Sequence, residues 1–146
     1  MTPSDLENLR SWCALRERCT DVVLQRLRRQ QVGEAEAEQA VERLRNEGFL
    51  DDRRYVEAYV EGHAVGRRWG PARIRAGLRA KRIPDALIAP ALARLDPAEA
   101  RETLHALARR RSDELPAGRE RVIRWLLRRG FPLDDVLAAV DAAAHR

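Results

Sequence analysis

Apolar residues in the middle of the chain follow helical spacing, interrupted by one clear break. Ile74 and Leu78 are one helical turn apart and therefore face the same side of a helix. Ile83 comes directly before Pro84, and a residue in that position leaves the helical conformation. A second apolar stripe follows the break, at Leu87, Ile88, Ala91, Leu92 and Leu95. The pattern predicts two helices joined by a tight turn.

The same order of apolar positions returns on both sides of this stretch. Before it, the matching residues are Val23, Leu27, Val32, Ala37, Val41 and Leu44. After it, they are Val122, Leu126, Phe131, Val136 and Val140. The copies are roughly 50 residues apart, a period that is typical of repeat proteins. Since a helix pair of this size cannot bury its apolar stripe alone, we expect neighbouring copies to stack on each other.

Helix start and stop signals divide each copy into three short helices. Pro71 and the pair Asp96-Pro97 are typical of first helical turns, and Gly48 is typical of the residue just past a helix end. We predict an all-α protein of three tandem three-helix repeats that form an elongated, curved array. The predicted repeats span residues 9–47, 51–95 and 97–144. Residues 1–8 are polar and are expected to be frayed.

The composition supports helices and points away from several classes of protein. Aromatic residues make up 5% of the chain, and alanine, leucine, arginine and glutamate, which favour helices, dominate it. The polar N-terminus and the lack of a long apolar run indicate a cytoplasmic protein without a membrane segment. The two cysteines do not form a disulfide framework. We find no metal-ligand spacing, no phosphate-binding glycine-rich loop and no catalytic set, and therefore expect no cofactor and no enzymatic activity.

Positive charge is the strongest chemical signal in the sequence. The net charge is +5, and of 28 basic residues only Lys81 is a lysine. Residues 67–82 hold seven positive residues and no acid, whereas residues 34–61 are mostly acidic. The candidate partner-binding residues are Arg67, Arg68, Arg73, Arg75, Arg79, Lys81, Arg82, Arg121, Arg124 and Arg128. We interpret them as a stripe that docks on an acidic groove or a phosphate backbone. The alternative is a solvated helix face in an arginine-rich proteome.

Several other polar and aromatic residues have structural interpretations. Asp51 and Asp52 are expected to cap a helix rather than to hold a metal. Trp12 and Trp125 are expected in the core, and Trp69 could either staple a helix start or be an exposed anchor. The histidines have no partner at a useful spacing and are expected at the surface or its rim: His63, His105 and His145.

Three short stretches also share the pattern of a known family. They are residues 48–55 (GFLDDRRY), residues 69–74 (WGPARI) with Leu78, Lys81 and Ile83 downstream, and residues 126–131 (LLRRGF). In these motifs the chain resembles the RecX regulatory proteins, which modulate the recombinase RecA. The resemblance extends from about residue 9 to residue 144. It implies an all-α protein of three three-helix repeats.

The resemblance also implies a function. It suggests a protein that docks in the helical groove of the RecA–DNA filament, limits filament growth or promotes disassembly, and so reduces strand exchange and ATP hydrolysis. The expected partners are the RecA filament and, weakly and without specificity, DNA; we expect an elongated monomer. The alternative is a DNA-binding regulator of the helix-turn-helix kind, because the helices are paired by short turns. Residues that read bases, such as Asn and Gln, are scarce on the basic helices, which weighs against it.

The chain departs from the family pattern at three places. Arg82 and Gln31 stand where the family usually has glycine, so these turns must close without a residue that adopts left-handed backbone freely. The segment 14–20 is short beside the family's usual lead-in. This leaves the packing of the first helix open.

Overall fold

The computed structural model describes residues 1–145, and helices account for nearly all of this range. The α-helices are α1 (Pro3–Leu15), α2 (Thr20–Arg29), α3 (Glu34–Asn46), α4 (Asp52–Glu61), α5 (Pro71–Ala80), α6 (Asp85–Ala93), α7 (Pro97–Arg110), α8 (Arg119–Arg128) and α9 (Leu133–Ala144). A π-helical turn, η1 (Gly62–Gly66), extends α4, and a 3-10 turn, η2 (Ser112–Glu114), follows α7. None of the helices in this range is both long and apolar enough to cross a bilayer.

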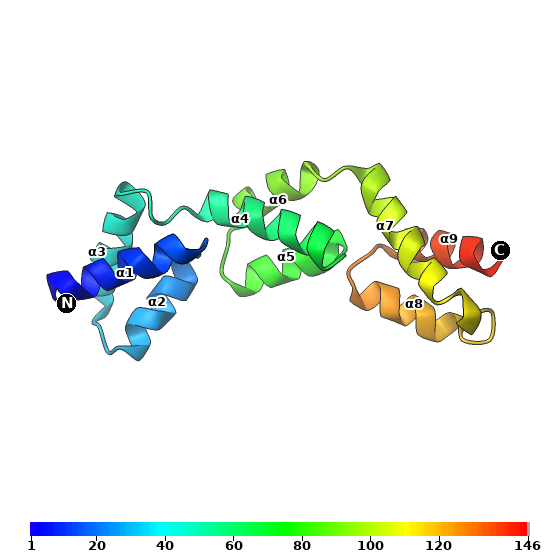
Figure 1. Cartoon of the computed structure of the whole chain (residues 1–146), viewed down its shortest axis with the longest axis horizontal. Coiled ribbons are helices and arrows are strands. Elements are labelled where there is room, and N and C mark those ends of the chain that lie inside the picture. The colour runs from blue at the N-terminus through cyan, green and yellow to red at the C-terminus, as the bar shows by residue number, and fades with distance from the viewer. Residues whose placement is uncertain (146) are drawn as a thin grey trace.

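The helices form three groups of three that follow one another along the long axis of the molecule (Figure 1). The two chain ends lie at opposite ends of this axis. The middle helices of the three groups, α2, α5 and α8, all lie along the lower edge in this view. The predicted fold class, an all-α array of helical repeats, is confirmed.

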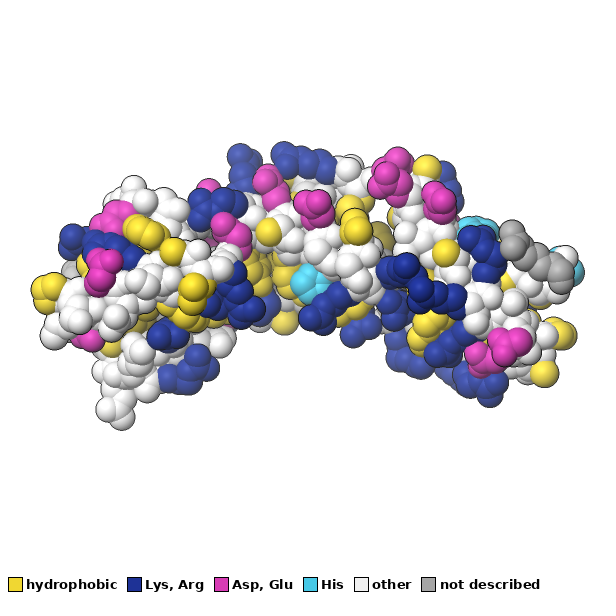
Figure 2. Space-filling model, in the orientation of Figure 1, with side chains coloured by type: hydrophobic (Ala, Val, Ile, Leu, Met, Phe, Trp, Pro, Cys, Tyr) yellow, Lys and Arg dark blue, Asp and Glu magenta, His cyan; other side chains and the backbone are white. Residues whose placement is uncertain are grey.

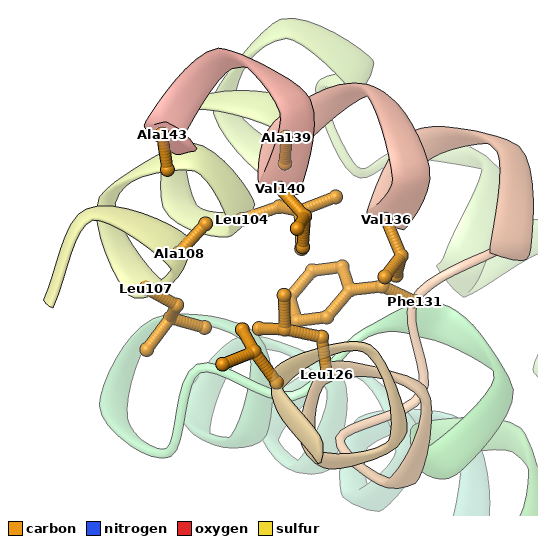
Figure 3. Packing of buried hydrophobic residues seen from close by; sticks show 10 residues of the cluster. Leu104, Leu107, Ala108, Leu126, Phe131, Val136, Ala139, Val140 and Ala143 are labelled. Atoms are coloured by element: carbon orange, nitrogen blue, oxygen red, sulfur yellow. The ribbon is translucent and has the colours of Figure 1, made fainter. Parts of the chain in front are cut away.

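Each group of helices encloses its own small core. The first is built from Leu9, Cys13, Val23, Leu27, Ala37, Ala40, Val41, Leu44 and Leu50. The second contains Cys19, Val56, Val60, Ile74, Leu78, Ile83, Ile88 and Ala91. The third contains Leu104, Leu107, Ala108, Val122, Leu126, Phe131, Val136, Ala139, Val140 and Ala143, with the Phe131 ring between Leu126 and the side chains of α9 (Figure 3). Full burial of one large aliphatic side chain contributes about 1.5–3 kcal/mol, so cores this small leave each unit dependent on its neighbours.

The turn after each middle helix has left-handed backbone at the equivalent position. The φ angle is 61° at Gln31, 58° at Arg82 and 100° at Gly130. After α5, the amide of Ile83 donates to the carbonyl of Leu78 at 3.2 Å, which satisfies a carbonyl that the helix end leaves open. Two of the three turns therefore close in the left-handed conformation without glycine, at a cost of about 1–2 kcal/mol for each non-glycine residue.

The N-terminal residues are helical, and the prediction that residues 1–8 are frayed is wrong. The Thr2 hydroxyl accepts from the Asp5 amide at 3.1 Å, and the Asp5 carboxylate accepts from the Thr2 amide at 2.8 Å. This reciprocal pair is a capping box that starts α1 at Pro3. The same two hydrogen bonds hold the pKa of Asp5 below its usual value. The amino group of Met1 is also paired, with Glu36 of α3.

Other helix starts agree with the sequence. The Asp51 carboxylate accepts from the Arg54 amide at 3.1 Å and caps α4, and the Asp96 carboxylate accepts from the Ala98 amide at 2.9 Å and caps α7. Gly48 is left-handed after α3, with a φ of 83°. Helix α2 starts differently: its N-cap is Cys19, which forms no side-chain cap hydrogen bond, and the Thr20 amide donates to the Asp52 carboxylate of the next unit at 2.8 Å.

Side chains hold the first unit to the second. Cys19, which precedes α2, is fully buried in the core of the second unit. Around it, the Thr20 amide donates to the Asp52 carboxylate, and Arg54 of α4 pairs with Glu17 at 2.6 Å. The segment between α1 and α2 is thus a shared part of two units rather than a connection between two helices.

Candidate interaction surface

The first group of candidate cations lies on α5 and at its end. Arg75 is exposed and has no carboxylate partner within residues 1–145. Arg79 forms two hydrogen bonds of 3.0 Å to Asp85, which lowers the pKa of that carboxyl group. Arg82 Nε lies 3.8 Å from Asp21 Oδ1. Although residues 67–82 contain no acid, acids outside this stretch therefore reach Arg79 and Arg82 in space.

The second group lies on α8. Arg121 Nε is 3.2 Å from Glu114 Oε1, so this arginine is paired within its own unit. Arg124 and Arg128 are exposed, and no carboxylate of residues 1–145 pairs with them. They provide positive charge that is available to a partner molecule.

The third group surrounds Trp69 in the loop before α5. The guanidinium carbon of Arg73 lies 4.1 Å from the indole centre, and that of Arg67 lies 5.8 Å from it. Trp69 also packs beside His63, with their ring centres 4.6 Å apart. His63 in turn stacks on Tyr59, with ring centres 3.7 Å apart. Trp69 is half-buried against the second core, so it both closes the helix entry and holds two arginines by cation–π contact. His63 is at the rim of the core, as expected.

The other two tryptophans are not fully inside their cores. Trp12 is half-buried beneath Arg18 and Arg26, whose guanidinium carbons are 3.9 Å and 4.2 Å from the ring. Trp125 is half-buried as well, with Arg111 at 3.9 Å. Both rings pack against buried residues, as the prediction of core positions requires. The outer face of each ring, however, is covered by an arginine guanidinium group.

The loop before α5 meets the end of α8 through main-chain atoms. The Gly70 amide donates to the Arg129 carbonyl at 2.7 Å, and the Ala72 amide donates to the Gly130 carbonyl at 3.1 Å. A Cβ atom at Gly70 would lie 2.4 Å from the carbonyl carbon of Gly130, so no side chain fits there. We call this contact the second joint, and the contact around Cys19 the first joint.

The second joint brings together arginines that the sequence analysis did not connect. The Arg129 guanidinium donates to the carbonyl oxygens of Arg67 and Arg68 across the joint. Burial, and then the nearby charges of Arg73, Arg68, Arg110 and Arg111, lower the pKa of Arg129. We call these five residues the joint cluster: Arg68, Arg73, Arg110, Arg111 and Arg129.

Sequence reasoning missed Arg110, Arg111 and Arg129 for a physical reason. Arg110 is the last residue of α7 and Arg111 is its C-cap, positions where basic residues are common, and both lie far from residues 67–82 in the chain. Only the contact between Gly70 and Gly130 brings the two segments together. The one signal in the sequence that could have indicated this contact is the presence of glycine at positions 70 and 130, because glycine allows two backbones to approach closely.

Positive side chains cover the lower edge of the second unit, the region where the second and third units meet, and the surface around α8 (Figure 2). Helices α5 and α8, which carry the unpaired Arg75, Arg124 and Arg128, both follow this edge, while other positive side chains lie along the upper edge of the second unit (Figures 1 and 2). The arrangement suits an extended anionic partner better than a small molecule.

Other chemistry has little support in the described residues. Within residues 1–145, no three His, Cys, Asp or Glu side chains gather as a metal-ligand set. Cys13 and Cys19 are unpaired and buried in different cores, and burial raises the pKa of both thiols. Both aspartates of the pair Asp51 and Asp52 are used as caps.

Comparison with known proteins identifies the family. The family model described as RecX, second three-helix domain, matches residues 51–92. A regulatory protein RecX from Thermus thermophilus is 44% identical over 107 residues, which cover 73% of this chain and 70% of the relative. This chain belongs to the RecX family. A RecX from Pseudomonas putida is 31% identical over 125 residues, with 83% of this chain and 79% of the relative covered. The resemblance seen in the three motifs is therefore confirmed.

Solved structures of RecX proteins share the fold. The crystal structure of RecX from Lactobacillus salivarius superposes with a TM-score of 0.83 at 20% identity and covers 98% of this chain and 97% of its own. A second RecX crystal structure has a TM-score of 0.82 at 24% identity, with coverage of 93% and 70%. At these identities the likeness establishes the helical array, and it leaves the contact residues to be argued from this chain.

Proposed function

We propose that this RecX-family chain regulates recombination by binding the RecA–DNA filament along its helical groove. Binding there limits filament growth or promotes disassembly, and thereby lowers strand exchange and ATP hydrolysis. Family membership supports the regulatory role. The elongated array supports a partner that is itself extended, since a row of units offers its contacts along a line.

The observation that carries the proposal is the set of unpaired cations on and beside α5 and α8. Of the ten candidate residues, only Arg79, Arg82 and Arg121 have a carboxylate partner within residues 1–145, which leaves seven. The exposed pair of Arg79 with Asp85 is worth little, so a partner could still recruit Arg79. Positive residues without local acids attract an anionic surface and accelerate association with it.

The unit of action in this proposal is a monomer in the cytoplasm. Its partners are the RecA filament and, through phosphate contacts alone, DNA. Binding to duplex DNA should be weak and unspecific, with a salt slope of about 0.9 per phosphate contacted. Sequence-selective, nanomolar binding to duplex DNA would instead favour a helix-turn-helix regulator.

The test uses preformed RecA filaments on single-stranded DNA and follows ATP hydrolysis. Wild-type protein should lower hydrolysis at less than one copy per RecA protomer. The double variant Arg75→Glu with Arg124→Glu should weaken this inhibition at least tenfold, because both residues are exposed, unpaired and on the middle helices.

The matched control is Arg53→Glu with Arg101→Glu, which changes the net charge equally at exposed positions on α4 and α7. Circular dichroism should show the same helix content in both variants. No inhibition by wild-type protein at equimolar amounts would reject the proposed function. Equal loss in the two variants would reject the proposed surface.

A further inference from the structure

A groove lies at the second joint, between the end of α4 and the first turns of α7 (Figure 1). Its volume is about 430 Å³, which is within the usual range for ligand sites in proteins. The second unit lines it with the π-helical turn η1 and the loop before α5, and the third unit lines it with α7 and Phe131. The groove therefore exists only where the two units meet.

Much of the lining is apolar, and the apolar surface continues onto the rim. Trp69 and Leu95 are half-buried and Phe131 is buried, whereas Val65 lines the groove and is still 73% exposed. Val65 lies on η1, and π-helical turns are rare in proteins and frequently occur at functional sites. A small molecule enclosed in the hollow would leave much of Val65 in water, whereas a chain segment that runs over the rim would cover it.

The charged side chains of the groove are mostly acidic, although the protein as a whole has a net charge of +5. The lining acids are Asp96, Glu99 and Glu102, and Arg68 of the joint cluster lines the groove with them. None of the three carboxylates forms an ion pair within residues 1–145. Asp96 caps α7 and Glu99 lies in its first turn, where the helix dipole favours an acid, but Glu102 lies beyond that turn. Figure 2 shows acidic side chains over the start of α7.

We propose that this groove binds a segment of a partner protein in which an apolar side chain lies between lysines or arginines. The apolar side chain enters the hollow and contacts Val65, Trp69 and Leu95, and the cations on either side of it pair with Glu99 and Glu102. The inference goes beyond the proposed function, because it gives the protein a second partner whose charge is opposite to that of the partner of α5 and α8.

The charge of the groove favours a basic protein segment over a nucleic acid. A phosphate backbone in the groove would meet three carboxylates that no ion pair neutralises, and like charges brought together at an interface suppress binding. Arg75, Arg124 and Arg128 do not line the groove, so a bound segment leaves these arginines available. One molecule can therefore hold an anionic and a cationic partner at the same time. A segment bound across the second joint would also stabilise it.

Two variants test the two parts of the site. Glu99→Gln with Glu102→Gln removes the acids that pair with the segment, and Val65→Gln removes the apolar rim. All three side chains are exposed, so both variants should keep their helix content. The control is Glu38→Gln with Glu120→Gln, which changes the net charge equally at exposed positions on α3 and α8 that form no ion pair within residues 1–145.

The probe is a short fluorescent peptide with a leucine at its centre and lysines and arginines on both sides; a second peptide has serine in place of the leucine. Fluorescence anisotropy at constant ionic strength measures binding, and NMR shifts of backbone amides locate it. The leucine peptide should bind the wild-type protein and shift the amides of Val65, Thr103 and Ala106, which line the groove. Binding should weaken about fivefold when the two exposed ion pairs are lost and less than about twofold in the control. Val65→Gln, or serine in the peptide, should weaken it by about threefold or more.

Each other result overturns the site. No binding of the leucine peptide, or amide shifts confined to other parts of the molecule, would show that the groove does not take such a segment. Equal weakening in the control variant would mean that only net charge matters. Self-association of the wild type that Val65→Gln abolishes would assign the groove to a second copy of this chain, and competition by a thymidine oligonucleotide for the same amides would assign it to a nucleic acid. Because these measurements contain no RecA, they can fail while filament inhibition persists, and filament inhibition can fail while they succeed.

Discussion

The two joints of the array are built from different parts of the chain. The first joint uses side chains: Cys19 enters the second core, Asp52 accepts from the Thr20 amide, and Arg54 pairs with Glu17. The second joint uses main-chain atoms of the loop before α5 and of the end of α8, which meet at Gly70 and Gly130, and adds the Arg129 side chain, which donates to the Arg67 and Arg68 carbonyls.

This difference determines how each joint responds to substitution. In a joint built from side chains, several residues each contribute part of the stability, so substitution of any one of them lowers the stability only moderately. A main-chain joint depends on the absence of side chains, so one added methyl group forces the two backbones apart. We therefore expect the second joint to be the more sensitive of the two.

The largest effect is expected from Gly70→Ala. The new Cβ would lie 2.4–2.5 Å from the main-chain atoms of Gly130 and Phe131, which cannot move aside as a flexible side chain could. The free energy of unfolding should fall by about 3 kcal/mol, the upper part of the usual range for overpacking. Urea denaturation, with hydrogen exchange at α8 and α9, measures the loss.

The control for this variant is Gly62→Ala. A Cβ atom there meets nothing within 4 Å, and the φ of −62° suits alanine. Stability should stay the same or rise slightly. If Gly70→Ala proved as stable as Gly62→Ala, the second joint would not be the rigid contact described above.

A smaller effect is expected at the first joint from Asp52→Ala. The substitution removes the acceptor of the Thr20 amide, and loss of a helix cap costs about 1 kcal/mol. Exchange of the Thr20 and Asp21 amides should accelerate. Asp52→Asn keeps an acceptor oxygen and should retain most of the stability; an equal loss in both variants would point to the charge of Asp52 rather than to its hydrogen bond.

The smallest effect is expected from lowering the pH. Protonation of carboxylates should reduce the stability of the first unit, whereas the main-chain carbonyls that accept hydrogen bonds in the second joint do not titrate. Hydrogen bonds from Arg10 at 2.6 Å and 2.8 Å, then one from Arg43, lower the pKa of Glu47 to about 2 from an ordinary 4.5. A lowered pKa in the folded state means that the stabilisation is present above pH 4.5 and is lost as the pH falls toward 2. Glu47→Gln should therefore reduce the melting temperature slightly at pH 7 and not at pH 2.

A matched comparison for this prediction is Glu38→Gln on α3, the helix that ends just before Glu47; the Glu38 carboxylate is exposed and forms no ion pair within residues 1–145. Its melting temperature should follow that of the wild type at every pH. A Glu47→Gln difference that persisted at pH 2 would show that Glu47 contributes through packing rather than through its charge.

Local signals in the sequence were sufficient to predict the helices and most of the residues at which they begin and end. Asp51, Asp96 and Gly48 act within a few residues of the helix they delimit, so their roles follow from neighbouring positions alone. The capping box of Thr2 and Asp5 was equally local and was overlooked because polar terminal residues were read as frayed. The left-handed Gln31 and Arg82 show that tertiary packing can impose a conformation that these residue types disfavour.

Contacts between units could not be predicted in the same way. Helical spacing places Arg75 and Arg79 on one flank, but it does not reveal that Arg79 donates a hydrogen bond to the Asp85 carboxylate. It also does not bring Arg129 near Arg68, whose carbonyl accepts from the Arg129 guanidinium, because their proximity depends on the angle at which two units meet. The candidate surface was therefore predicted as a stripe of cations on separate helices, whereas the contacts of Arg129 with the Arg67 and Arg68 carbonyls depend on how the units meet at the second joint.

Gly130, at the third turn, is required for a contact between units, which is not the case at the other two turns. Gln31 and Arg82 reach the same backbone conformation with full side chains, so the turn alone does not require glycine. At Gly130 a Cβ would lie 2.5 Å from the Arg73 amide nitrogen, in the unit before it. Among proteins with this architecture, a glycine at only one of the equivalent bends would therefore mark the bend that packs against a neighbouring module, and its replacement during evolution would indicate a changed angle between those two modules.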